Sequence, residues 1–168
     1  AAQAVRALTG LGADLMTLHG SGGSAMLKAA AVAAADEARR LSVIRPKLLA
    51  VTVLTSIDAD EWKKLGHTNS ISQSVLTMAG AAKAAGMDGT VSSPHEAAEI
   101  RRLNGPDFLI VTPGIRPSFA QSDDQKRITT PKEAVQNGAT HLVVGRPITK
   151  AADPQEAARA IAEEIREV

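Results

Sequence analysis

A short stretch near the carboxyl end of the chain, "HLVVGRPI", combines a strand-like run with residues that suit anion binding. Gly145 has no side chain, so a ligand can approach the backbone N–H groups around it. Arg146 adds a planar, permanently charged guanidinium, and Pro147 suits the first turn of a helix, where exposed N–H groups attract anions. These residues predict a phosphate site, although an ordinary turn with a solvated arginine also fits them.

The polar segment 114–129 lies just before this stretch and is long for a connection between a strand and a helix. About 2–6 residues usually suffice for such a connection. The segment carries Arg116 and Gln125, followed by Lys126 and Arg127. We interpret it as a lid that closes over a charged ligand, with a plain surface loop as the alternative.

Two adjacent hydroxyl side chains, Thr55 and Ser56, follow the apolar run "KLLAVTVL" at residues 47–54. At the end of a strand they can hydrogen-bond the polar edge of a heterocycle, or they can cap the helix that follows. His19 also ends a strand-like run. There a buried structural histidine is favoured over a catalytic base.

Short apolar runs alternate with longer helical patterns along the whole chain. The runs are nearly continuous, which is typical of parallel strands buried on both faces. The expected strands cover residues 13–19, 47–54, 88–92, 107–113 and 141–145. An opening helix, "AAQAVRAL", is followed by expected helices at residues 24–41, 58–64, 72–85, 93–103, 130–138 and 153–168. This pattern predicts an α/β fold with five βα units in a single domain, residues 1–168.

Five βα units fit either an open doubly wound sheet or part of a TIM (β/α)8 barrel. In both architectures ligands bind at the carboxyl ends of the strands, where glycines, hydroxyls and arginines gather in this sequence. Five strands cannot close a barrel of eight, so the barrel interpretation places three units before residue 1. The opening helix, which no strand precedes, favours the barrel.

The composition limits the classes of function. A net charge of +1 and 2% aromatic residues argue against a nucleic-acid-binding surface. The absence of cysteine excludes disulfides and thiolate chemistry. No apolar run reaches the roughly 20 residues that span a membrane, and no signal peptide is visible. A cytoplasmic enzyme or binding protein is therefore expected.

Six motifs together point to a family. In order and spacing, "DLMTLHGSGG", "AVTVLTS", "DGTVSS", "VTPGIRP", "DDQKRITTP" and "VVGRPIT" resemble the bacterial orotidine 5′-phosphate decarboxylase family over nearly the whole chain. The resemblance implies a TIM barrel of which this chain carries about the last five βα units. It also implies a homodimer with active sites near the interface. The implied reaction converts orotidine 5′-phosphate to UMP and CO2 without metal or organic cofactor.

The resemblance also implies roles for individual residues. Arg146 and Gln125 would hold the phosphate, together with the backbone N–H groups of Gly145 and Arg146. Gln125 would bridge phosphate and base when the lid closes, and Arg116 would be a ligand contact of that closing loop. Thr55 and Ser56 would both contact the pyrimidine.

The chain departs from the family pattern at the catalytic centre. The family's Asp-x-Lys-x-x-Asp motif, which stands just before a helix like "AAQAVRAL", does not occur in this sequence. No catalytic residue is therefore assigned, and the chain alone is expected to lack turnover. Two alternatives stay open: another phosphate-binding barrel enzyme, of the keto-gulonate-phosphate decarboxylase or ribulose-phosphate epimerase type, and a non-catalytic nucleotide-binding remnant.

Overall fold

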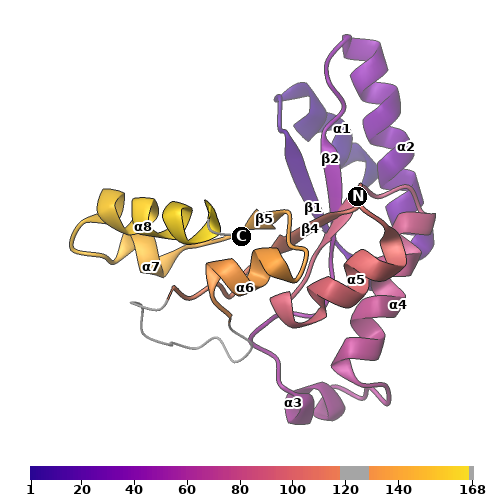
Figure 1. Cartoon of the computed structure of the whole chain (residues 1–168). Helices are drawn as coiled ribbons and strands as arrows, with labels where there is room; N and C mark the ends of the chain where they lie inside the picture. The colour runs from indigo at the N-terminus through magenta and orange to yellow at the C-terminus, as the bar shows by residue number, and fades with distance from the viewer. Residues whose placement is uncertain (118–128, 167–168) are drawn as a thin grey trace.

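The computed structural model describes residues 1–117 and 129–166, and in them five parallel strands form one sheet (Figure 1). Each strand pairs with the next one along the chain, in the order β1-β2-β3-β4-β5. A doubly wound sheet reverses its strand order at a switch point, whereas a barrel keeps it sequential. The doubly wound alternative is therefore wrong, and the sheet is a segment of a barrel wall. The strands are β1 (Leu15–His19), β2 (Lys47–Val51), β3 (Gly89–Val91), β4 (Leu109–Thr112) and β5 (His141–Leu142).

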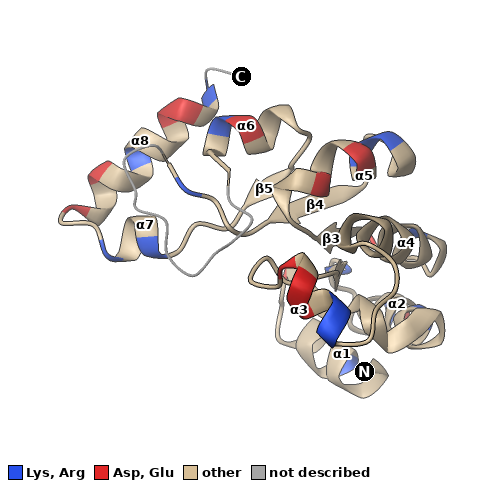
Figure 2. Cartoon of the chain, turned by 90° about the horizontal axis from the view of Figure 1, so that it is seen from below, with Lys and Arg blue, Asp and Glu red and all other residues tan. Residues whose placement is uncertain are grey.

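The helices follow one side of the sheet as an arc, with α1 and α8 at opposite ends (Figures 1 and 2). Most of them lie in the connections between consecutive strands, as parallel pairing requires. Two short 3₁₀ turns, η1 (Gly20–Gly22) and η2 (Pro94–Glu96), precede α2 and α5. The helices are α1 (Ala2–Gly10), α2 (Gly23–Leu41), α3 (Ala59–Lys64), α4 (Ile71–Ala84), α5 (Ala97–Asn104), α6 (Pro131–Gln136), α7 (Arg146–Thr149) and α8 (Pro154–Arg166).

The main core lies between the sheet and this helical layer. Met16, Leu48 and Ala50 point from the sheet into a cluster with Leu27 and Ala30 of α2. The alanines of α2 keep the helix close to the strands because their side chains occupy little space. A second cluster packs α4 and α5 against β4. These two clusters explain why the apolar runs of the sequence form a buried sheet.

Arg101 ties the ends of two helices together. Its guanidinium Nη1 donates to the carbonyl oxygens of Gly105 (2.6 Å) and Pro106 (2.7 Å), just after α5. Its Nη2 donates to the carbonyl of Gly138 (3.0 Å), just after α6. One cation therefore satisfies three carbonyl groups of two helix ends that are far apart in sequence.

Replacing Arg101 with alanine is expected to lower the free energy of unfolding by about 2 kcal/mol, because hydrogen bonds to a charged group each contribute about 1.5–3 kcal/mol. Arg102 is the matched control, since it is exposed and pairs with Glu99 one turn away on the helix surface. Arg102→Ala should cost less than about 0.5 kcal/mol. Urea unfolding of both variants compares the two arginines, and equal losses would contradict the tying role of Arg101.

Candidate functional site

The parallel sheet brings the predicted site segments together along the carboxyl ends of its strands, which we call the site edge. Thr55, Arg116 and Arg146 each stand four residues beyond the last residue of β2 (Val51), β4 (Thr112) and β5 (Leu142), respectively. Three inter-strand steps separate β2 from β5, which corresponds to about 14 Å. The edge is therefore long enough for an elongated ligand with a polar ring at one end and an anion at the other.

Hydrogen bonds continue past the strands and fix this edge. The hydroxyl of Thr52 donates to the carbonyl of Val91 and shares a second hydrogen bond with the hydroxyl of Ser92, both at 3.1 Å. The N–H of Val143 donates to the carbonyl of Thr112 (2.9 Å), whose own hydroxyl donates to the His141 carbonyl (3.4 Å). Thr52, Ser92 and Thr112 are buried. These threonine and serine side chains therefore hold the strand ends together rather than facing a ligand.

Thr55 and Ser56 form a turn after β2, closed by the Ile57 N–H donating to the Leu54 carbonyl (3.1 Å). Thr55 is buried and Ser56 is exposed. The cap of α3 is Asp58, whose carboxylate accepts from the Glu61 N–H at 2.9 Å. The alternative that the two hydroxyls serve as the helix cap is therefore wrong, and the pyrimidine contact stays a prediction.

Gly145 is the N-cap of α7, and its carbonyl accepts from the N–H groups of Ile148 (2.9 Å) and Thr149 (3.0 Å). A short helix is present here, as expected, and Pro147 is its second residue because the helix begins at Arg146. Within residues 1–117 and 129–166, a Cβ atom placed at Gly145 would meet no other atom within 4 Å, so no described side chain fills the space in front of this backbone. Arg146 is half-buried and belongs to a short basic helix (Figure 2). Open backbone beside a guanidinium is compatible with the predicted phosphate site.

β5 is shorter than the sequence predicts. It covers only His141–Leu142, and residues 143–145 lie outside the strand. The reason is that β4 ends at Thr112, so that Val143 makes the last bond of the ladder. Among the described residues no strand pairs with the other edge of β5. Because β5 ends at Leu142, the connection from the strand to Gly145 is longer than predicted.

Arg116 lies at the base of the long polar segment. Ile115 pairs with Thr129 in a parallel bridge, and the Arg116 N–H donates to the Thr129 carbonyl at 2.9 Å. The Arg116 side chain is buried, and its Nη1 donates to the carbonyl of Ile115 (2.9 Å). Gln125, the predicted bridge between phosphate and base, lies outside the described residues.

A carboxylate secures the return of this segment into α6. Glu133 Oε2 accepts from the hydroxyl of Thr129 (2.6 Å) and from the N–H of Thr130 (3.1 Å), while the Thr130 hydroxyl accepts from the Glu133 N–H (3.2 Å). The hydrogen bond from Thr129, followed by those from Thr130, lowers the pKa of Glu133 below its ordinary value of 4.5. This capping box joins Thr129, and through it the Arg116 backbone, to the helix.

The lowered pKa of Glu133 predicts a loss of stability in acid. A carboxyl with a depressed folded-state pKa stabilises fully above its unfolded value of 4.5 and loses that contribution as the pH falls through the folded value. Glu133→Gln removes this titration while keeping an oxygen acceptor. The variant should lose stability less steeply than the parent below pH 4.5, and urea unfolding between neutral pH and about pH 3 measures the slopes. Parallel slopes would contradict the assignment.

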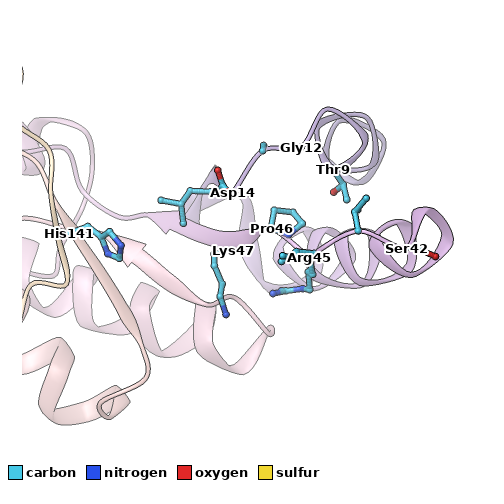
Figure 3. A pocket seen from close by; sticks show the side chains of 12 residues that line it. Thr9, Gly12, Asp14, Ser42, Arg45, Pro46, Lys47 and His141 are labelled. Atoms are coloured by element: carbon cyan, nitrogen blue, oxygen red, sulfur yellow. The ribbon is translucent and has the colours of Figure 1, made fainter.

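A hollow of about 630 Å³ opens at the other end of the strands, where β1 and β2 begin (Figure 3). Residues after α1 and α2 line it, and His141 faces them from β5. The sequence gives no signal for this hollow, because its lining comes from loops and from strand starts. It lies away from the predicted site and does not belong to it.

His19 is exposed, so the prediction of a buried histidine there is wrong. It lies on the face of β1 that points away from the helices. In the described part of the chain no side chain buries this face, since Leu15 and Thr17 on the same face are exposed as well. Within residues 1–117 and 129–166 no group of three or more His, Asp or Glu residues could hold a metal ion. In the same residues no helix is both long and apolar enough to cross a membrane.

Comparison with known proteins decides the family. The profile of the "Orotidine 5'-phosphate decarboxylase / HUMPS family" matches residues 1–161. The chain belongs to this family. A relative named orotidine 5'-phosphate decarboxylase from Moorella thermoacetica is 49% identical over 98% of this chain and 66% of its own length. A relative of the same name from Trichlorobacter lovleyi is 52% identical, again over 98% of this chain and 67% of its own length.

A solved structure supports the same conclusion for the fold. The orotidine 5'-phosphate decarboxylase of Lactobacillus acidophilus matches with a TM-score of 0.82 and 39% identity, over 98% of this chain and 68% of that one. The expected TIM-barrel fold and the family resemblance are therefore confirmed. The chain spans about two thirds of the length of these orotidine 5'-phosphate decarboxylase relatives.

Proposed function

We propose that residues 1–168 form the phosphate- and base-binding part of an orotidine 5′-phosphate decarboxylase. The complete enzyme would convert orotidine 5′-phosphate to UMP and CO2 in pyrimidine synthesis. The observation that carries the proposal is the common edge at which the segments after β2, β4 and β5 lie, in a chain 49% identical to a protein of that name.

The phosphate site is proposed at the start of α7. Arg146 and the backbone N–H groups of Gly145 and Arg146 hold the phosphate, with Gln125 as a further ligand. The open space in front of Gly145 supports this assignment, because a phosphate must come close to the main chain there. A guanidinium presents parallel donors that suit two phosphate oxygens at once.

The base site is proposed at the turn after β2. Thr55 and Ser56 meet the pyrimidine, and Arg116 supplies a ligand contact from the base of the polar segment. Support comes from the position of this turn, three strands from the phosphate site along the same edge. A ligand bound at both ends would be fixed in one orientation, which is the requirement for reaction at a single ring carbon.

The chemistry of decarboxylation shows what this chain contributes. Loss of CO2 leaves a carbanion on a ring with little delocalisation, which a preorganised cation must stabilise. The sequence has no Asp-x-Lys-x-x-Asp motif to supply that cation and its neighbouring carboxylates. Its residues instead provide binding energy at the remote phosphate, which can be used to position the reacting ring.

The 168-residue chain alone is therefore expected to release no CO2 from orotidine 5′-phosphate above the uncatalysed rate. Carboxyl-labelled substrate gives the most sensitive measurement. Turnover that survives repeated purification and disappears with Arg146→Ala would contradict the division of roles described above.

A fusion protein tests the proposed function itself. In it, residues 1–168 replace the matching segment of the M. thermoacetica relative, and the remaining part of that relative stays in place. The fusion is expected to release CO2 from orotidine 5′-phosphate. A folded fusion that binds UMP without turnover would instead support the non-catalytic remnant, which the absence of the motif favours.

The remaining expectations are proposals of the same kind. The complete protein would act as a single barrel domain, as a homodimer in the cytoplasm, and without metal or organic cofactor. The mass of the fusion in solution tests the dimer. Activity after exhaustive treatment with a chelator tests the independence from metal.

A further inference from the structure

Residues 52–70 separate β2 from α4, and they contain both the turn with Thr55 and Ser56 and the short helix α3. About 2–6 residues usually suffice between a strand and the helix that covers it, so this connection is long. Figure 1 shows α3 beyond the strand ends, beside the start of α4. The position of Thr55 and Ser56 therefore depends on how the connection packs, because both residues lie outside the strands.

Apolar side chains on both sides of this turn pack into one cluster. Val53, which comes shortly before Thr55, is 4% exposed and belongs to the cluster that contains Trp62 of α3. Ile57, directly after Ser56, is partly buried against the same cluster. Trp62 is 6% exposed and has the largest side chain in the cluster. The turn is therefore held on both sides by a core to which Trp62 contributes.

The indole of Trp62 has a fixed orientation. Its Nε1–H donates to the carbonyl oxygen of Asn69 at 3.1 Å, so the polar edge of the buried ring is satisfied. Its face stacks on the imidazole of His67, with ring centroids 3.6 Å apart and planes 9° from parallel. The backbone N–H of Trp62 donates to the Asp58 carbonyl at 3.0 Å, and its carbonyl accepts from the His67 N–H at 3.4 Å. The residue therefore joins α3 to the segment that leads into α4.

These contacts of Trp62 fold the connection onto itself. Asp58, His67 and Asn69 all lie within residues 52–70. α3 has six residues, and helices that short are marginal in water without tertiary contacts. Without the indole, α3 would keep its Asp58 cap but lose the stack and the hydrogen bond to Asn69. The connection could then shift, and the turn with Thr55 would shift with it.

We propose that Trp62 is a positioning residue of the base site, which holds the turn after β2 so that Thr55 and Ser56 stand at the site edge in the orientation that a pyrimidine requires. Trp62 acts through the turn and not by touching the ligand, because its indole is buried in the cluster and stacked on His67. The inference rests on the proposed function, which places the pyrimidine at this turn. The phosphate site follows β5, three strands away, and should be independent of Trp62.

Fragments of the nucleotide separate the two sites in NMR titrations of the fusion with the M. thermoacetica segment. Uridine carries the base without the phosphate, and ribose 5-phosphate carries the phosphate without the base. Trp62→Leu removes the ring and its N–H, and should weaken uridine binding by about ten-fold, as expected for the loss of one well-formed hydrogen bond to the base. Trp62→Phe keeps a ring that can stack on His67, and should weaken uridine binding by about three-fold. Neither variant should change the affinity for ribose 5-phosphate.

Phe108→Leu is the control for a general loss of core packing. Phe108 is 4% exposed in the same cluster but lies just before β4, at the end of the strands opposite the site edge. This variant should lower the Tm of the fusion as Trp62→Leu does, and should bind uridine like the parent. Unchanged uridine affinity of folded Trp62→Phe, or equal losses for uridine and ribose 5-phosphate, would overturn the proposal even if Trp62→Leu does not fold. A parent fusion that binds neither fragment nor UMP would contradict the proposed function, and the positioning role with it.

Discussion

Gly89→Ala is expected to lower the free energy of unfolding by about 3 kcal/mol, the upper end of the usual cost of overpacking. A Cβ atom at this position would lie 2.2 Å from the carbonyl oxygen of Leu109 and 2.5 Å from its Cβ. The oxygen belongs to the backbone of the neighbouring strand, which is held by the Leu109 N–H donating to the Asp88 carbonyl (2.9 Å). The strand therefore cannot move aside without loss of pairing between β3 and β4.

Gly80→Ala is the matched control for this prediction. Gly80 lies in α4, and a Cβ there would meet no other atom within 4 Å. The same substitution should stabilise the chain by about 0.5–1 kcal/mol, because alanine favours a helix over glycine. Urea unfolding of both variants measures the difference. A tolerated alanine at residue 89 would show that β3 and β4 can separate at Gly89 without loss of their pairing.

Arg146→Ala, introduced into the fusion with the M. thermoacetica segment, is expected to raise the KM for orotidine 5′-phosphate by about 30-fold or more. The estimate follows from the loss of charge-assisted hydrogen bonds of about 2–3 kcal/mol. The value of kcat should change less, because the residue is proposed to hold a group remote from the reacting carbon. Steady-state kinetics separates the two constants.

Two controls accompany the Arg146 variant. Arg159→Ala removes an exposed arginine of α8 and should leave the KM unchanged. Orotidine, which lacks the phosphate, should react equally slowly with the parent fusion and with Arg146→Ala. An unaltered KM for the phosphorylated substrate, or an equal loss with the unphosphorylated one, would contradict the phosphate role of Arg146.

The positions of the strands could be predicted from the sequence because apolar runs and helix signals are local. The helix at Thr130 shows this well, since its capping box with Glu133 is present as the residue types indicate. The length of β5 could not be predicted in this way. Residues 143–145 look like strand, but whether they pair depends on where β4 ends and on what lies beyond the edge.

The candidate site could be predicted as a set of strand ends, but not as a geometry. Parallel order alone brings the segments of Thr55, Arg116 and Arg146 to one edge. Local sequence could not reveal that Arg116 is buried at the base of its segment, because its backbone pairs with Thr129 across many residues. Nor could it reveal the exposure of His19, which depends on what covers the face of β1 that points away from the helices.

The proposed function requires the phosphate of a uridine nucleotide to bind at the start of α7. Amide NMR of isotope-labelled fusion protein, titrated with UMP and separately with uridine, tests it most directly. We expect UMP to shift the Gly145 and Arg146 amide signals strongly and uridine to leave them nearly unchanged, while both ligands shift the signals of Thr55 and Ser56. Saturable UMP binding with unmoved Gly145 and Arg146 signals would contradict it.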